Sequence, residues 1–365
     1  MAPDAQTPNQ DVPDKTAGRP GAFGRWAKSI SAVIAVLGVV SATIGYINNG
    51  AHFFTQISDY FHGQSEVRTL IQTADERLAH KDYEAAWNAN GKAVQLAPRN
   101  VDALAQQARV AMKWLEEVHT GSANGPKTFS AVADPLKTAL VARVVGATGQ
   151  EKADLQAHIG WANFLHSRDG NPETDIAEEF DSAIAADSGN MYGRVMRGFW
   201  ILWKGGPIDK ARPDLDIALA SPTDPAFSDM MIISALTNNT SAPFIAGAIE
   251  YADKIRLAGR NIDNHTKGTL LWYYSVSLHD NDLPGRIAKT LPPEEQIAFL
   301  DWLKQGDLSD SDKRVAAYFT ARFTELAGKK GDAIAMYKQL MGPKPDLDEE
   351  ITRLSQADLR RLQKR

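Results

Sequence analysis

Glycine-rich, histidine and carboxylate clusters are the parts of this chain whose residue types and spacing could support chemistry. Residues 121–128, GSANGPKT, have the glycines and the lysine of a phosphate-binding loop. Such a loop needs a glycine immediately before its lysine, so that backbone N–H groups can enclose a phosphate. Pro126 stands there and has no N–H to donate. We therefore expect a loop between helices and no nucleotide site.

The remaining candidates for catalysis or metal binding are also weak. The eight histidines are scattered without an HExxH motif, and the chain has no cysteine. His158 and His166 are eight residues apart, which is too far for direct binding of one ion. Acidic clusters at 178–181 and 346–350 are typical of solvated helix faces. We expect surface histidines, no cofactor, no metal and no catalytic residue.

A helical run around Trp200 carries the best candidate for binding a protein. Tryptophan is a frequent anchor in interfaces. Arg194, Arg197 and Lys204 share its helix, and an arginine fork binds carboxylates well. We predict that Arg194, Arg197, Trp200 and Lys204 contact a protein or peptide partner. For this tryptophan, and for the aromatic residues 272–274, burial between helices is the alternative.

The elements that would position these residues are helices separated by glycine and proline turns. Such turns occur at 169–172, 204–207, 221–225 and 290–293, and no stretch shows sustained period-two alternation. We therefore expect almost no sheet. The net charge of −5 gives no electrostatic footprint for nucleic acid.

One spacing of small and bulky apolar residues recurs along these helices. It is seen in Ala86, Ala93 and Pro98, and again in Ala333, Tyr337, Leu340 and Pro345. The middle of the chain repeats it in Ala211, Leu215 and Ala218, with Phe180 and Ala183 standing 35 residues before the last two. A recurrence near 34 residues indicates stacked helix pairs. Helices approach closely only where side chains are small, and proline ends a helix.

The stretch from Val67 to Pro98 resembles a tetratricopeptide repeat. Ala74 and Ala86 stand at the small positions where two helices cross, twelve residues apart, and Ala321 and Ala333 repeat this offset. Asn90 departs from the family pattern, because an aromatic residue is usual there. Repeats are well matched at 67–100 and 313–346, less well at 155–188 and 189–223, and poorly at 101–154 and 224–312.

We therefore expect an all-α fold, an alpha-solenoid of tetratricopeptide-like hairpins over 67–346, followed by a C-terminal helix or tail over 347–365. A general alpha-solenoid outside the family is the alternative. The resemblance implies a non-catalytic helical groove that binds a protein or peptide. We expect the poorly matched regions to be irregular hairpins that complete the stack.

The N-terminal region predicts a membrane anchor. Residues 1–24 are polar and proline-rich, as in a disordered tail. The apolar run from Ile30 to Ile47 is about 27 Å long as a helix, close to the thickness of a bilayer core of about 30 Å. No Asp, Glu, Lys or Arg occurs between Lys28 and Asp59. We predict a transmembrane helix over 25–48 and a juxtamembrane segment over 49–66. A cleaved signal peptide and a buried core helix are the alternatives.

The charges around this run predict its orientation. Arg19, Arg25 and Lys28 precede it, and Asp59 is the first charge after it. The positive-inside rule places the N-terminus in the cytoplasm and the repeats outside it, in the periplasm of a Gram-negative cell. The sequence thus predicts a membrane-tethered scaffold in the inner membrane. The alternatives are a regulatory or sensor subunit of a signalling or secretion complex, a cytosol-facing adaptor, and an enzyme with a helical active site.

Overall fold

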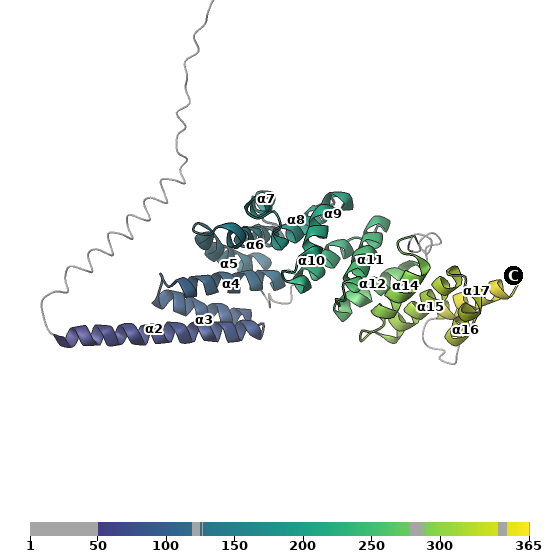
Figure 1. The fold of residues 1–365 in the computed structure, drawn as a ribbon, viewed down its shortest axis with the longest axis horizontal. Helices are drawn as coiled ribbons and strands as arrows, with labels where there is room; N and C mark the ends of the chain where they lie inside the picture. Colours follow the sequence, from purple (N-terminus) through teal and green to yellow (C-terminus); the bar gives the residue numbers. More distant parts are fainter. Residues whose placement is uncertain are drawn as a thin grey trace, which may run out of the picture. The chain divides into compact units, whose positions relative to one another are not determined.

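A computed structural model describes residues 50–118, 125, 127–277, 287, 289–341 and 349–364, with side chains from Gln64 onward. All regular elements in these ranges are helices, as Figure 1 shows. The chain divides into two compact units, Met1–Glu66 and Val67–Arg365. The predicted tail 1–24 and transmembrane helix 25–48 lie outside the described residues. Among the described residues, no helix has both the length and the apolar character needed to span a membrane.

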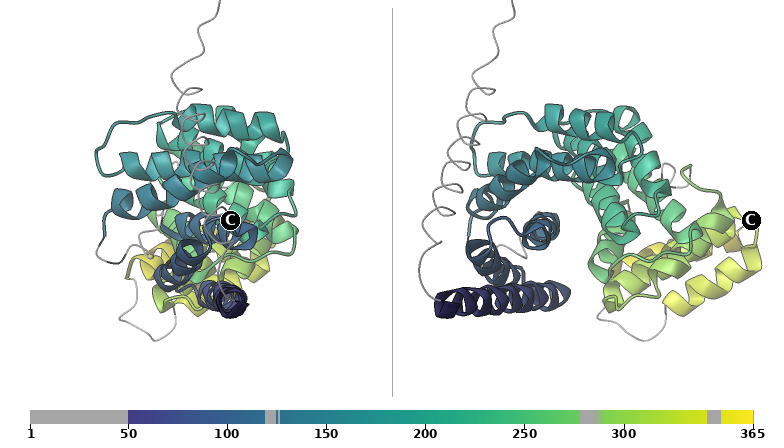
Figure 2. Two further views of the ribbon diagram at one scale, coloured as in Figure 1. Left: turned by 90° about the vertical axis from the view of Figure 1, so that its left-hand side faces the viewer. Right: turned by 60° about the vertical axis from the view of Figure 1, so that its left-hand side comes forward.

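The helices follow one another along the second unit, as the two views in Figure 2 also show. Residues 50–66 of the predicted juxtamembrane segment form the start of α2, and the predicted C-terminal segment 347–365 contains α17. The helix bounds are α2 (Gly50–Ala79), α3 (Tyr83–Leu96), α4 (Val101–Val118), α5 (Phe129–Val144), α6 (Gly149–Ser167), α7 (Ile176–Ala186), α8 (Met191–Trp203), α9 (Ile208–Ala220), α10 (Pro225–Thr237), α11 (Ala242–Leu257), α12 (Asn264–Ser277), α14 (Pro293–Leu303), α15 (Asp310–Leu326), α16 (Lys330–Leu340) and α17 (Glu349–Gln363).

Consecutive helices pack as pairs. The α4/α5, α6/α7, α8/α9, α10/α11 and α15/α16 pairs are all in contact, and α2, α3 and α4 share a buried apolar cluster. Even-numbered helices also touch each other along the first part of the stack, from α4 to α6, α8 and α10. The all-helical prediction is confirmed. The poorly matched region 101–154 folds as the α4/α5 hairpin, and 224–312 holds the α10/α11 hairpin with α12 and α14.

The small residues predicted at helix crossings are fully buried. Ala74, Ala86 and Ala93 have no exposed surface in the first pair, and α3 ends at Leu96, two residues before Pro98. In α15 and α16, Ala321, Ala333 and Tyr337 are likewise inaccessible. The middle positions of the recurrence are also buried, namely Phe180, Ala183, Ala211, Leu215 and Ala218. Pro345 lies outside the described residues.

Two glycines in the middle of the stack also allow paired helices to approach closely. A Cβ on Gly160 in α6 would lie 2.9 Å from Cε1 of Phe180 in α7. A Cβ on Gly198 in α8 would lie 2.6 Å from Cδ2 of Leu215 in α9. Real Cβ atoms do not approach neighbours this closely, so each glycine lets its helix lie against the next one.

The departure at Asn90 has a structural reason. Asn90 is fully buried in α3, and its Nδ2 donates to the carbonyl of Ala103 in α4 at 3.0 Å. An amide that hydrogen-bonds to the neighbouring helix therefore occupies the position where an aromatic side chain would fill space.

Candidate functional site

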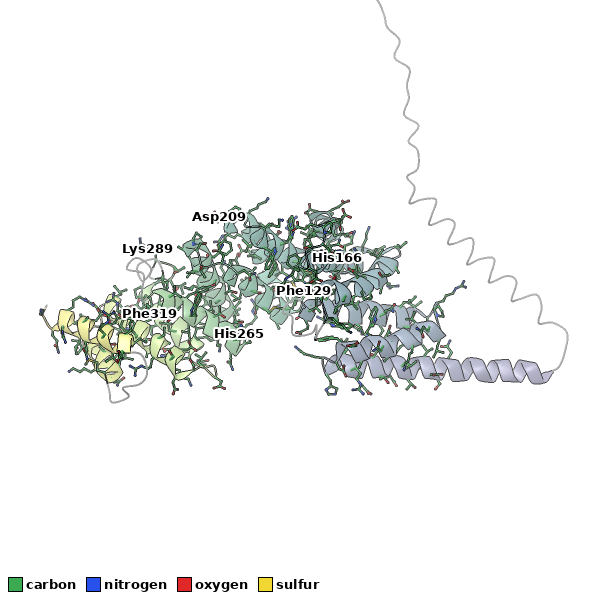
Figure 3. All side chains as sticks on the ribbon, turned by 180° about the vertical axis from the view of Figure 1, so that it is seen from behind. Phe129, His166, Asp209, His265, Lys289 and Phe319 are labelled. Carbon is green, nitrogen blue, oxygen red and sulfur yellow. The ribbon has the colours of Figure 1, made fainter. Side chains whose placement is uncertain are left out.

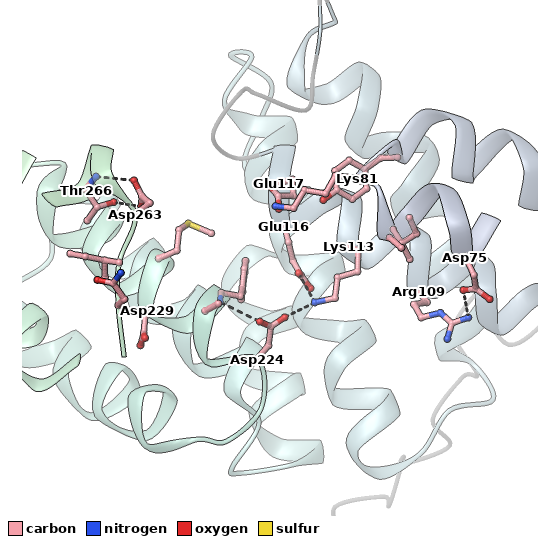
Figure 4. A pocket seen from close by; sticks show the side chains of 18 residues that line it. Asp75, Lys81, Arg109, Lys113, Glu116, Glu117, Asp224, Asp229, Asp263 and Thr266 are labelled. Atoms are coloured by element: carbon pink, nitrogen blue, oxygen red, sulfur yellow. Dashed lines mark hydrogen bonds and ion pairs between the residues drawn. The ribbon is translucent and has the colours of Figure 1, made fainter. Parts of the chain in front are cut away.

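A cavity of about 860 Å³ lies within the second unit, as Figure 4 shows. Its lining comes from the C-terminal end of α2 with the turn that follows it, the start of α3, the second half of α4, the start of α10, and the segment from the end of the α11–α12 loop into α12. We call it the groove. It brings together residues from Asp75 to Thr266, which are far apart in the sequence.

Lys113 is the central cation of the groove. Its Nζ lies 2.8 Å from Oε2 of Glu116, one turn further along α4, and 2.5 Å from Oδ2 of Asp224. The same nitrogen lies 3.3 Å from the hydroxyl of Tyr192 in α8. Burial by itself lowers the pKa of Lys113, but Glu116 and Asp224 outweigh it, so the pKa lies above its usual range. Lys113 is therefore a charged group held by two carboxylates.

Asp224 reaches Lys113 from an unusual backbone conformation. It is the N-cap of α10, with φ at +38°, and its Oδ1 accepts from the backbone N–H of Phe227 at 3.3 Å. Non-glycine residues rarely adopt positive φ, and aspartate tolerates it because its side chain bonds locally. Burial raises the pKa of Asp224, but the Lys113 contact more than offsets this and the pKa is lowered. Pro225 then begins the helix.

Behind this pair lies a buried histidine, which corrects the prediction of surface histidines. His158 in α6 is 0% exposed, and its Nδ1 lies 2.7 Å from the carbonyl of Asp154. A carbonyl only accepts, so Nδ1 carries a hydrogen. Nε2 lies 3.2 Å from Oε1 of Glu116, the carboxylate whose other oxygen holds Lys113. The position is inaccessible because the ring packs on Tyr192, with centroids 4.7 Å apart.

On the α10/α12 side, the groove contains a buried carboxylate with an oxygen that accepts no hydrogen bond. Asp229 is 3% exposed, and Arg260 Nη1 lies 3.1 Å from its Oδ1. This contact lacks hydrogen-bond geometry, and Oδ1 has no hydrogen-bond donor. Burial raises the pKa of Asp229 to about 6, although Arg260 acts to lower it. Asp263 stands nearby in the lining and accepts from the backbone N–H of Thr266 at 2.9 Å.

The lining also contains apolar side chains. Leu78 and Tyr83 contribute from α2 and α3, and Phe227, Met230 and Ile262 from the other side. Among the residues that the structure describes, no group of three or more His, Asp and Glu side chains could hold a metal ion. The groove thus combines paired charges with apolar surface, an arrangement suited to recognition of another molecule.

Arg194, Arg197 and Lys204 do not line the groove. Arg194 Nη1 donates to Oδ1 of Asp214 in α9 at 2.8 Å, and Arg197 Nε donates to Oδ2 of the same carboxylate at 2.7 Å. Arg197 also bonds Asp181 in α7 at 2.6 Å. These two arginines therefore face the odd-numbered helices, and internal carboxylates already supply the charge that a partner would bring.

The other predicted aromatic and basic residues lie partly at the surface and partly between the helices. Lys204 bonds Glu173 at 3.0 Å, at the surface. Trp200 is half-buried, and its indole nitrogen is buried without a hydrogen-bond partner. Tyr273 and Tyr274 are buried between helices, whereas Trp272 is about half exposed. Partner binding by the four predicted residues stays a prediction.

Sequence reasoning missed the groove because its central contacts are long-range. Lys113 meets Tyr192 and Asp224 after 79 and 111 residues of chain. One local signal was present. Glu116 stands among buried residues of α4, on a strongly amphipathic helix, and a charged residue on an apolar face indicates a buried partner.

Comparisons with known proteins give a limited result. No protein-family model matches the chain, and no curated protein does. Among solved structures, the chain is similar to a tetratricopeptide repeat protein from Parabacteroides merdae, with 12% sequence identity and a TM-score of 0.38, over 80% of this chain and 99% of that one. This likeness is too low to assign a function, and the paired-helix architecture rests on the described helices themselves.

Proposed function

We propose that the protein is a non-catalytic, membrane-tethered scaffold that binds a protein or peptide partner in the groove. The observation that supports this best is the groove itself, a cavity of about 860 Å³ built by five separate segments. Leu78 and Met230 offer apolar contact there, beside charges held in place by internal pairs. Burial of this apolar surface against a partner would favour association.

The membrane tether in this proposal rests on the apolar run Ile30–Ile47, which has the length of a membrane span. In this proposal the N-terminus is cytoplasmic and the repeats lie outside the cytoplasm. A reporter that is active only in the periplasm, fused after Arg365, tests the orientation. Activity of a cytoplasm-only reporter at the same position would contradict it, and release of the protein by alkaline carbonate would contradict the anchor.

A bulky substitution tests the groove. Ala226 lines it and is exposed, so Ala226→Trp fills the groove from the solvent side without disturbing the core. Ala185 on α7 is also exposed but does not line the groove, and Ala185→Trp is the matched control. The full chain in mild detergent is used to recover partners from its own cells. We expect proteins retained by the wild type and the control to be lost with Ala226→Trp.

The same experiment includes the surface on α8. Trp200→Ala and Lys204→Ala are suitable variants, since neither removes a partner of the buried Asp214. If partners depend on Trp200 and Lys204 and are indifferent to Ala226→Trp, the groove is not the binding surface and the α8 assignment is supported. If no recovered protein depends on either surface, the scaffold proposal fails.

A further inference from the structure

Acidic side chains outnumber basic side chains in the lining of the groove. Six carboxylates line it, from Asp75, Glu116, Glu117, Asp224, Asp229 and Asp263, against the three cations Lys81, Arg109 and Lys113. Even with Arg260, which pairs with Asp229 from outside the lining, carboxylates are in excess. A surface of this sign raises the local concentration of cationic groups.

Each cation of the lining is already bound to a carboxylate of this chain. Lys81 lies 2.8 Å from Glu117, and Arg109 lies 3.0 Å from Asp75. Lys113 is shared between Glu116 and Asp224. The described part of the lining therefore holds no unpaired cation to receive an acidic ligand, and such a ligand would have to compete with these pairs.

The carboxylates of the α10/α12 side are balanced by cations less completely than those around Lys113. Asp263 has hydrogen bonds from Thr266 but no cation within ion-pair distance among the described residues. Oδ1 of the buried Asp229 lacks a hydrogen-bond donor. A carboxylate that is buried without a donor is destabilised, and a donor with positive charge would relieve this most.

The apolar part of the groove lies next to these carboxylates in the sequence. Met230 follows Asp229 in α10, and Ile262 precedes Asp263 just before the start of α12. Because these apolar and acidic side chains line one cavity, a ligand that fills it also covers apolar surface. A lone inorganic cation cannot do so, and a polyamine offers only short methylene spacers, whereas a peptide with alternating basic and apolar side chains covers a larger apolar area.

We infer that the occupant of the groove is a segment of a partner protein that carries lysine or arginine next to an apolar residue. This inference rests on the proposed function and adds the chemistry of the partner. The basic side chain pairs with Asp229 and Asp263, and the apolar side chain packs on Met230 and Ile262.

A random peptide library displayed on phage tests this with the full chain in mild detergent, and Ala226→Trp serves for counter-selection. We expect the groove-dependent peptides to be enriched in lysine and arginine beside apolar residues. Enrichment of acidic or uncharged peptides would overturn the inference while leaving the groove as a binding surface. If no enriched peptide depends on the groove, the proposed function fails as well.

Fluorescence anisotropy with an enriched peptide then tests the two carboxylates. Asp229→Asn should weaken binding roughly tenfold, because a charge-assisted bond to a buried group is lost. Asp263→Asn should weaken it about threefold, since this residue is exposed, and asparagine keeps the helix cap. The control is Asp209→Asn on α9, a carboxylate that is 95% exposed and outside the lining, visible in Figure 3.

Unchanged affinity in both groove variants would overturn the inference. A competition experiment distinguishes a partner protein from a segment of this chain as the occupant of the groove. A synthetic peptide of residues 15–28, which includes Arg19, Arg25 and Lys28, should not displace the enriched peptide. Displacement by it, or groove-dependent self-association in sedimentation, would show that the occupant is this chain and not a partner protein.

Discussion

At the scale of single residues, the structure depends on buried carboxylates whose charges are balanced from neighbouring helices. Asp214 is the clearest example. It is 2% exposed and accepts from both Arg194 and Arg197. A buried charge that loses its partner is costly, so these arginines stabilise the fold whether or not they bind a partner.

Arg197→Met should lower the free energy of unfolding by about 1.5–3 kcal/mol, because two hydrogen bonds to a buried charge are lost while Arg194 remains. Urea denaturation measures this. The matched control is Lys204→Met, whose bond to Glu173 joins two half-exposed side chains and should cost less than about 1 kcal/mol. Equal losses in the two variants would contradict the buried role of Asp214.

Asp229 predicts a pH dependence of stability. Its pKa in the folded protein is about 6, above the value of about 3.9 for an unfolded aspartate. The folded state therefore holds this proton more tightly, so its contribution to stability is present below about pH 4 and is lost as the pH rises to about 6.

We expect Asp229→Asn to raise the free energy of unfolding at pH 7 by about 1–3 kcal/mol relative to the wild type. The difference should vanish near pH 4, where both side chains are neutral. Urea denaturation at several pH values between 4 and 7 measures it, with Asp209→Asn expected to follow the wild type. A stabilisation by Asp229→Asn that grows towards pH 4 would contradict the raised pKa.

At the scale of helices, close approach between paired helices decides the packing. Gly160 and Gly198 take this role in α6 and α8. In an exposed helix, replacing glycine by alanine stabilises by about 1 kcal/mol. Where the added methyl group meets a buried ring, the sign reverses.

Gly160→Ala should therefore destabilise the protein by about 1–3 kcal/mol, since its Cβ would clash with Phe180. Gly91→Ala is the control, because no atom lies within 4 Å of the added Cβ in α3, and it should stabilise slightly. Thermal unfolding of both variants beside the wild type measures the difference. A stabilising Gly160→Ala would show that α6 and α7 have room between them.

The helices differ in how far their packing could be predicted from the sequence. Ala74, Ala86 and Ala333 were predicted because a small residue at a fixed offset acts within one helix pair. Gly160 was not, because glycine in a helical run indicates flexibility as readily as close contact. The partners of Arg194 could not be assigned, since helix periodicity does not give the rotation of α8 against α9. The groove could not be predicted either, because small rotations between successive helix pairs add up along the stack and decide which distant helices meet.

The C-terminal helix α17 is fixed to the stack more firmly than a basic tail would be. Asp358 accepts from Tyr318 at 3.0 Å and from Arg322 at 2.8 Å, both in α15. Arg361 Nη2 lies 2.6 Å from Glu325 of the same helix. With Ile351 and Leu362 buried, α17 covers the last pair as a terminal cap.

At the scale of the whole second unit, most contacts join helices that are near in sequence. Stability in such a stack is close to a sum of local terms and contacts between neighbours. Unfolding of one helix pair should therefore leave distant pairs folded. This separates the stack from a globular domain of the same size, in which one core defect weakens every element.

Hydrogen exchange checks this with a pair of mirrored variants. Phe319→Ala removes a buried ring in α15 that packs on Tyr274 with centroids 5.2 Å apart, and should speed exchange in α12–α17 with little change in α4–α7. Phe164→Ala in α6 should do the opposite. Uniform loss of protection in either variant would indicate one cooperative unit.

The contacts of Lys113 do not follow this local pattern. The Lys113–Asp224 pair joins side chains separated by 111 residues of chain. A stack of helix pairs deforms as a spring does, because small rotations between successive pairs add up along it. A salt bridge between helices that are distant along the stack therefore resists stretching of the part between them. Both members are partly exposed, so salt weakens the bond. We therefore expect the tensile stiffness of the α4–α10 part of the stack to fall as ionic strength rises.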